Sequence, residues 1–275
     1  MSGSMNAVDM DFEQIGAFHT KGEEPPNRFE VARETLKSFV ANRKGDRVGL
    51  VVFSSEAYLK FPLTLDYETA IGQLDALALD SRERRRNRPG CTNNCTIKGD
   101  ATAIGDALSK AYKRLEKSDG KGKVIVLVTD GNNNSGNLEP MDVAGYIGDQ
   151  PDATRPRLYT FLLGSGARTK TPTMYRTRNG DIRLARNLGF LDYASTEDKV
   201  DEERIRELAE AARGEFRVTY NDEEFRESFE NLERGEHAER KVARHQDLFP
   251  MVLLAALVLL ALEYLLAVTL LRRYP

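Results

Sequence analysis

The sequence predicts an α/β protein with a doubly wound, mainly parallel sheet, helices on both of its faces, and one C-terminal transmembrane helix. Three observations support this prediction. Short apolar runs alternate with segments whose apolar residues recur every three or four positions. The runs at 47–54 and 123–129 are apolar almost throughout, which is typical of strands buried on both faces. Residues 248–271 are apolar with the single charge of Glu263, a run long enough for a tilted transmembrane helix.

The apolar runs predict the individual strands, and the apolar residues that recur every three or four positions predict the individual helices. In residues 28–43 the apolar stripe Phe29, Ala32, Leu36 and Phe39 indicates an amphipathic helix. Pro62 places the second strand at a sheet edge, because proline donates no ladder hydrogen bond. The elements predicted besides that helix are the strands 47–54, 57–63, 123–129, 157–164 and 215–220, and the helices 66–77, 103–118, 139–149, 202–213 and one from about 222.

Two segments interrupt the pattern. Residues 80–100 are basic and then rich in turn residues, and we interpret them as a solvated surface insertion. The five arginines between 82 and 88 would also suit an acidic partner or a lipid headgroup. Residues 165–200 are polar and predicted to be irregular, with a hairpin turn at Asn179-Gly180.

Composition excludes some functional classes. The 275 residues carry 40 Lys and Arg against 43 Asp and Glu, a net charge of −3, so nucleic-acid binding through bulk positive charge is not expected. No N-terminal signal peptide is predicted. Cys91 and Cys95 have no cysteine or histidine near them that would complete a zinc site. A local disulfide and two free thiols are both open interpretations.

The chain is expected to have one globular domain and one membrane anchor. We assign residues 1–233 to the domain, 234–247 to a charged linker, 248–271 to the transmembrane helix and 272–275 to a short tail. The linker holds more positive charge than the tail, which by itself favours a cytoplasmic domain. Glu263 within the span either pairs with another subunit's helix or is a tolerated polar residue.

Candidate ligand-binding residues lie where the strands of such a sheet end. They are the Ser2-Gly3-Ser4 segment, Thr102 ahead of a helix, and Asp130 after the strand 123–129. Hydroxyls and a carboxylate are hard oxygen donors that suit Mg²⁺ or Mn²⁺. Taken singly, each has an ordinary structural explanation: a turn for the serines, and a helix cap for Thr102 and for Asp130.

Taken in order, the three resemble the metal-ion-dependent adhesion site of von Willebrand factor A domains, Asp-x-Ser-x-Ser, then Thr, then Asp. Met1, Ser2, Gly3 and Ser4 match the first part, Thr102 lies in DATAIGDAL and Asp130 in LVTDGNN. Residues 26–77 and 101–118 further resemble the membrane-anchored A domains of the bacterial aerotolerance (Bat) family.

This resemblance implies a binding protein and not an enzyme. Ser2, Ser4 and Thr102 would hold the ion, Asp130 would accept hydrogen bonds from its bound waters, and the ion would bridge to an Asp or Glu of a partner. It implies work beside a MoxR-type AAA+ ATPase and other membrane A-domain proteins, in envelope-protein assembly or protection under oxidative stress. It also implies the bacterial inner membrane with the domain in the periplasm, contrary to the local charge count.

One departure from the family pattern stands out. The motif's opening Asp, at the end of a central first strand, would precede Met1. We therefore expect that the first strand and one carboxylate are missing, through a late start, a truncation or a genuine short form, and that Mg²⁺ or Mn²⁺ binding is impaired. The alternative function is a metal-dependent phosphatase that uses Asp130, since TDGNNN resembles the Asp loop of haloacid-dehalogenase-type phosphatases. That alternative needs a second apolar strand that ends in Asp-x-Asp to supply the nucleophile, and we find no such strand in the sequence.

Overall fold

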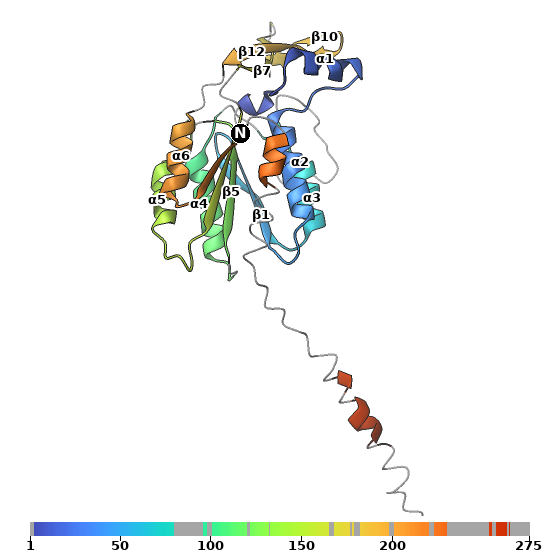
Figure 1. Ribbon diagram of the computed structural model, residues 1–275, viewed down its shortest axis with the longest axis vertical. Helices are drawn as coiled ribbons and strands as arrows, with labels where there is room; N and C mark the ends of the chain where they lie inside the picture. The colour runs from blue at the N-terminus through green and yellow to red at the C-terminus, as the bar shows by residue number, and fades with distance from the viewer. Residues whose placement is uncertain are drawn as a thin grey trace, which may run out of the picture. The chain divides into compact units, whose positions relative to one another are not determined.

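The chain divides into two compact units, Met1–Glu233 and Arg234–Pro275, and the first is an α/β unit (Figure 1). The residues described by this computed structural model are 3–79, 96–97, 101–119, 122–131, 133–164, 168–176, 178, 182–197, 201–219, 223–229, 253–254, 257–262 and 264.

The central strands form two separate sheets. β1 (Val48–Phe53) pairs antiparallel with β2 (Ala57–Thr64). β5 (Val124–Thr129), β6 (Arg157–Leu163) and β13 (Glu215–Thr219) are parallel, in the order β13-β6-β5. Within the described ranges no ladder joins β1 to β5. The single, mainly parallel sheet predicted from the sequence is therefore wrong in this respect: strand pairing is mixed and the sheet is in two parts.

The short connection between β1 and β2 explains why these two strands are antiparallel. Only residues 54–56 connect β1 to β2, and a parallel crossover needs a dozen residues or more. In the described part of the chain β2 pairs with β1 alone, so the edge position predicted from Pro62 is confirmed. A further short parallel pair joins β3 (Ala78–Leu79) to β4 (Thr96–Ile97).

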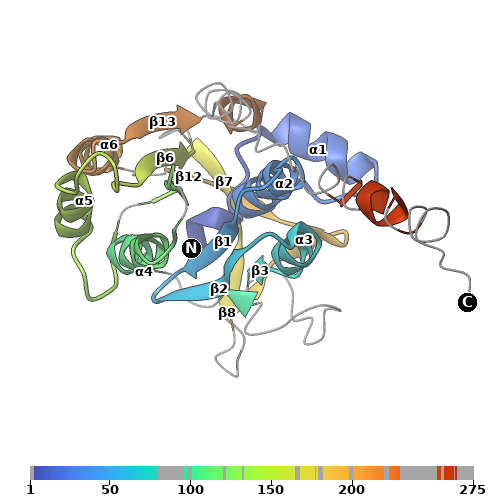
Figure 2. The ribbon, with the colours of Figure 1, turned by 90° about the horizontal axis from the view of Figure 1, so that it is seen from below.

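Helices cover both faces of the strands, as predicted (Figure 2). One face is covered by α2 (Arg28–Ala41), α3 (Tyr67–Asp75) and the helical residues 223–229. The other face is covered by α4 (Ile104–Glu116), α5 (Pro140–Gly148) and α6 (Glu202–Ala211). Each layer buries its apolar stripe against the strands, which is the arrangement that stabilises an α/β sheet.

The last helix of this unit docks on β6 through aromatic rings. The ring of Phe161 lies 4.9 Å from that of Phe229 and 5.8 Å from that of Phe225. Phe225 and Phe229 are four residues apart, so they share one face of the helix. All three side chains are buried, and each contributes on the order of 2 kcal/mol of apolar burial.

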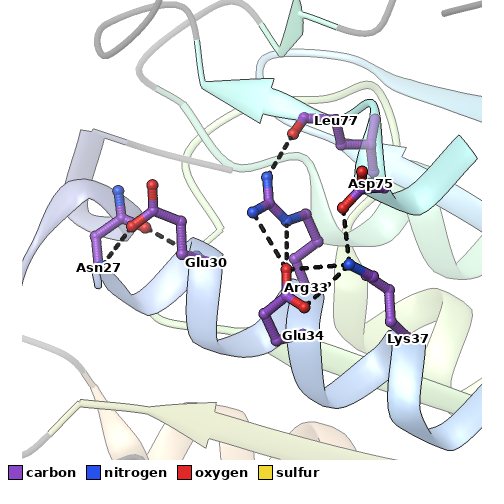
Figure 3. A network of polar contacts seen from close by, with 7 residues as sticks. All are labelled: Asn27, Glu30, Arg33, Glu34, Lys37, Asp75 and Leu77. Atoms are coloured by element: carbon purple, nitrogen blue, oxygen red, sulfur yellow. Dashed lines mark hydrogen bonds and ion pairs between the residues drawn. The ribbon is translucent and has the colours of Figure 1, made fainter. Parts of the chain in front are cut away.

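Polar contacts join α2 to α3 at the surface (Figure 3). Asn27 and Glu30 form a capping box that starts α2. Lys37 Nζ lies 2.7 Å from Asp75 Oδ1, and Arg33 Nη1 donates to the backbone oxygen of Leu77 at 3.1 Å. The hydrogen bond to Asp75 raises the pKa of Lys37. These contacts fix the pairing of two helices whose apolar sides already meet in the core.

The prediction that residues 165–200 are irregular is wrong. They form short antiparallel pairs of strands: β7 with β12, β8 with β9, and β10 with β11. The bounds are Arg168–Pro172 for β7, Met174–Arg176 for β8, Ile182–Leu184 for β9, Arg186–Asn187 for β10, Phe190–Leu191 for β11 and Tyr193–Glu197 for β12. β8 and β9 flank the predicted hairpin turn at Asn179-Gly180, two residues that lie outside the described ranges.

A helix covers these strands in a part of the chain for which the sequence analysis predicted no helix or strand. α1 (Phe12–Thr20) starts with a capping box in which Asp11 accepts from Gln14 N–H. Ile15 of α1 packs with Val8, Leu191 and Tyr193 in a small apolar core of its own. We call α1 with β7 to β12 the cap; Figure 1 shows α1 beside β7, β10 and β12. The sequence did not predict the cap, because the core of the cap is made from two segments that are far apart in the chain.

The predicted transmembrane helix 248–271 lies largely outside the described residues. Of this span, residues 253–254, 257–262 and 264 are described, and they are helical. No helix in the described part of the chain is both long and apolar enough to cross a membrane. Cys91, Cys95 and the five arginines between 82 and 88 also lie outside the described residues.

Candidate functional site

Asp130 lies where the sequence placed it, directly after β5. Its side chain is buried. The turn that follows is closed by Thr129, whose hydroxyl contacts the backbone oxygen and nitrogen of Gly131. Because β5 and β6 are parallel, Asp130 stands at the carboxyl edge of the three-stranded sheet, where α/β proteins bind ligands.

Thr102 precedes α4, and its hydroxyl does not cap that helix. The N-cap residue is Ala103, which has no side-chain capping bond. Instead, the loop after β5 supplies the acceptors: Thr102 N–H donates to Asn134 Oδ1 at 2.7 Å, and Ile104 N–H donates to Asn133 Oδ1 at 2.8 Å. Thr102 is 1% exposed, and its Oγ1 has no hydrogen-bond partner among the described residues. The ordinary explanation for this threonine is thereby removed.

The same loops bring the ends of the two sheets together. Ala103 N–H donates to Ser54 O, directly after β1, at 2.8 Å. Ser135, in the loop after β5, donates from its Oγ to Ser55 O at 2.8 Å. The carboxyl ends of β1 and β5 therefore meet at one edge, with Thr102 between them.

Ser4 lies in the short 3₁₀ helix η1 (Gly3–Asn6) and is half-buried. Its backbone oxygen accepts from Ala7 N–H at 2.9 Å, and Ala7 O in turn accepts from Arg28 N–H at 2.9 Å. Val8 then bridges to Lys170 of β7 through two backbone hydrogen bonds. Ser4 is thus tied both to the start of α2 and to the cap. Ser2 lies outside the described residues.

Arg28 and Asp9 belong to this site, and the sequence analysis missed both. Arg28 donates from Nε and Nη2 to the two oxygens of Asp9, each at 2.7 Å. Its Nη1 lies 3.7 Å from Asp130 Oδ2. The three side chains are nearly inaccessible, at 2% for Arg28, 8% for Asp9 and 2% for Asp130. One sequence signal existed: an arginine in the first helical turn opposes the helix dipole, which calls for a compensating acid.

Asp130 therefore lies close to the start of α2, and η1 is hydrogen-bonded to that start through Ala7. Thr102 is hydrogen-bonded to the loop that follows Asp130. The donors are oxygen atoms of hydroxyls and a carboxylate, which fit a hard divalent cation such as Mg²⁺ or Mn²⁺. Among the described residues no group of three or more His, Cys, Asp or Glu side chains is placed to hold a metal ion. A cation here would depend on hydroxyl ligands, and Thr102 Oγ1 is buried and available for that role.

Comparison with known proteins identifies the domain. The family model of the von Willebrand factor type A domain matches residues 1–132, a range that contains Ser2, Ser4, Thr102 and Asp130. A curated relative, an uncharacterised protein of Borreliella burgdorferi, is 22% identical over 242 residues, or 87% of this chain. The chain spans 62% of that relative's length.

Two solved structures have the same fold. An aerotolerance-related membrane protein from Bacteroides fragilis is 22% identical with a TM-score of 0.53, and the match covers 84% of this chain and 92% of that one. The conserved hypothetical protein BatB from Bacteroides thetaiotaomicron is 21% identical with a TM-score of 0.55, covering 85% and 94%. At such identities the likeness extends to the fold alone. With the family match, these similarities confirm the resemblance drawn from the sequence: residues 1–132 match the von Willebrand factor type A domain family, and the chain shares the fold of Bat proteins.

Proposed function

We propose that this protein captures partner proteins through a divalent cation at the carboxyl edge of its sheets. Ser2, Ser4 and Thr102 are the proposed ligands of the ion, and Asp130 accepts hydrogen bonds from its bound waters. A Mg²⁺ or Mn²⁺ ion there supplies an electrophilic centre for a carboxylate of the partner. The single observation that carries the proposal is the buried Thr102 hydroxyl, which has no hydrogen-bond partner in the described structure.

Burying the Thr102 hydroxyl without a hydrogen-bond partner costs free energy, and this cost is the reason to expect a ligand there. A buried polar group left without a partner destabilises a fold by about 1–3 kcal/mol. The local structure has no need of it, because Asn133 and Asn134 satisfy the start of α4. A buried threonine hydroxyl without a hydrogen-bond partner is expected where a bound ligand supplies the missing contact.

The proposed affinity for the ion is weak in this chain. Asp130 is the one carboxylate of the proposed set, and ligand charge strongly determines divalent-cation affinity. Arg28 at 3.7 Å opposes a further positive charge. A partner that presents an Asp or Glu would therefore contribute much of the binding energy.

The proposed setting is the bacterial inner membrane, with a single C-terminal pass at residues 248–271 and the domain in the periplasm. The solved structures that share this fold include an aerotolerance-related membrane protein, which supports a membrane setting and a role in stress tolerance. The proposed partners are a MoxR-type AAA+ ATPase and other membrane A-domain proteins that act on cell-envelope proteins. Neither nucleic acid nor a catalytic reaction is part of the proposal.

The alternative, a phosphatase that uses Asp130, has less support. A nucleophilic carboxylate has to reach a phosphate ester in solvent. The Asp130 side chain is 2% exposed and lies beside a guanidinium. Phosphate release from an aryl phosphate, abolished in Asp130→Asn, would restore that alternative.

Thr102→Val tests the proposal, with Thr160→Val as a matched control. Both hydroxyls are buried and have no hydrogen-bond partner among the described residues, but Thr160 lies within β6, away from the site. Valine keeps the shape of the side chain, so neither variant should lose thermal stability, and each should gain about 1 kcal/mol by removing an unsatisfied group. Titration with Mn²⁺ should show at least about tenfold weaker binding for Thr102→Val alone. Unchanged binding in Thr102→Val would refute the assigned site.

A further inference from the structure

The loop of residues 133–138, after β5, holds the backbone of Thr102. Thr102 N–H donates to Asn134 Oδ1 at 2.7 Å, and Asn134 N–H donates back to Thr102 O at 3.1 Å. The Thr102 hydroxyl itself makes no hydrogen bond to any residue that the structure describes. With no hydrogen bond to direct the hydroxyl, its position follows that of the backbone that the loop holds.

Asp106, in the first turn of α4, fixes the far end of the same loop. Its Oδ1 accepts from Asn137 N–H at 3.1 Å and from Leu138 N–H at 3.0 Å, and its Oδ2 lies 3.2 Å from the Asn137 nitrogen. Hydrogen bonds from backbone N–H groups to a carboxylate are stronger than those between neutral groups. Because both oxygens of Asp106 are engaged by the loop, this carboxylate acts on the loop and is not among the proposed ligands of the ion.

Two glycines let the loop approach α4 closely. A Cβ on Gly105 would collide with the backbone oxygen of Leu138. A Cβ on Gly136, whose φ is +100°, would lie 3.2 Å from Asp106 Cγ. Glycine permits both the left-handed backbone and the short separation. The loop is therefore packed directly on the start of α4, with the Asp106 carboxylate at the contact.

We infer that Asp106 is a positioning residue for the proposed metal site and acts on the ion through the loop and Thr102. The inference rests on the proposed function and goes beyond it by assigning a role to a residue outside the proposed ligand set. Without the Asp106 carboxylate, the loop loses the hydrogen bonds at its far end, and the Thr102 hydroxyl is held less firmly. Groups that orient metal ligands in this way commonly contribute about 10–100-fold to metal affinity.

Two substitutions of Asp106 separate positioning from charge. Leucine approximates the shape and offers no acceptor, whereas asparagine keeps one acceptor oxygen and removes the charge. In Mn²⁺ titrations of the full chain, Asp106→Leu should bind about tenfold more weakly than the wild type, and no more weakly than Thr102→Val. Asp106→Asn should stay within about threefold of the wild type. Equal losses in the two variants would show that the charge of Asp106 acts on the ion directly, which overturns the inference.

A double-mutant cycle tests whether the effect passes through the Thr102 hydroxyl. In the Thr102→Val background, Asp106→Leu should weaken Mn²⁺ binding less than about twofold, because the ligand that it positions is already gone. A merely structural role for Asp106 would give the same fold loss in both backgrounds and would contradict the inference. Should Thr102→Val bind too weakly to titrate, the difference between Asp106→Leu and Asp106→Asn decides the inference alone.

Thermal unfolding without metal shows which variants fold. If Asp106→Leu does not fold, Gly136→Ala replaces it in both comparisons, because it keeps the charge of Asp106 and crowds its carboxylate. Mn²⁺ binding that depends on Thr102 but is unchanged in Asp106→Leu overturns the inference and leaves the proposed function intact. Mn²⁺ binding that is indifferent to Thr102→Val overturns both.

Discussion

Gly164 is the residue whose missing side chain makes room for Arg28. It follows β6 with a φ of +113°, a conformation that L residues avoid. We predict that Gly164→Ala lowers stability by about 1–3 kcal/mol and displaces the guanidinium from Asp130. Denaturant unfolding measures the loss. Gly145→Ala in α5, where a Cβ meets nothing within 4 Å, is the control and should raise stability by about 0.5–1 kcal/mol. Equal effects would contradict the close approach.

Tyr58 on β2 connects burial to alkaline stability. Burial raises the pKa of its hydroxyl to about 12, from about 10 in an unfolded chain. The folded state therefore disfavours the phenolate, so this stability is fully present below pH 10 and is lost between pH 10 and 12. We predict that Tyr58→Phe flattens the fall of the melting temperature over that interval. A difference in melting temperature between the two proteins that stays constant from pH 7 to pH 12 would refute the assignment, because it would report lost packing and not the titration of Tyr58.

At the scale of elements, the start of α4 depends on the loop that follows β5. Asn133 and Asn134 replace the side-chain cap that Ala103 cannot supply. We predict that Asn133→Ala destabilises the protein by about 1 kcal/mol and speeds hydrogen exchange in the first turn of α4. Hydrogen exchange with mass spectrometry provides the measurement. Thr102→Val should leave that turn protected, since its hydroxyl makes no cap; loss of protection there would show that the hydroxyl does cap the helix.

The cap shows how a second small core is assembled from distant segments. Val8 and Ile15 come from the start of the chain, and Leu191 and Tyr193 come from the strands β11 and β12. Each segment alone is short and mostly polar, so neither the helical nor the strand period stands out. Residues 165–200 could not be assigned from the sequence for this reason.

At the scale of the whole α/β unit, the separation of the two sheets is the main feature. In the described structure β1 pairs with β2, and β5 with β6, while loops at their carboxyl ends meet around Thr102. Each sheet leaves an edge whose backbone groups have no ladder partner within the described ranges. A strand that pairs with both edges would join them into one sheet.

We therefore predict that an engineered N-terminal extension with an apolar strand ending in Asp, directly before Met1, raises the thermal midpoint. It should also tighten Mn²⁺ binding, because it adds a carboxylate next to the proposed ligands. The matched control is the same extension ending in Asn, which should stabilise equally without the gain in Mn²⁺ affinity. Equal affinity and equal stability of the extended and given forms would show that the motif alignment misplaces the site.

By itself the sequence determined the longer helices and strands outside the cap, since their apolar periods are local properties of the chain. It also determined Thr102 and Asp130 as candidates, because each follows or precedes a strongly periodic element. Only the tertiary structure decided that the sheet is in two parts, that the cap exists, and that Arg28 and Asp9 stand beside Asp130. Those features depend on contacts between residues far apart in the chain, and on buried charges whose partners no local pattern specifies.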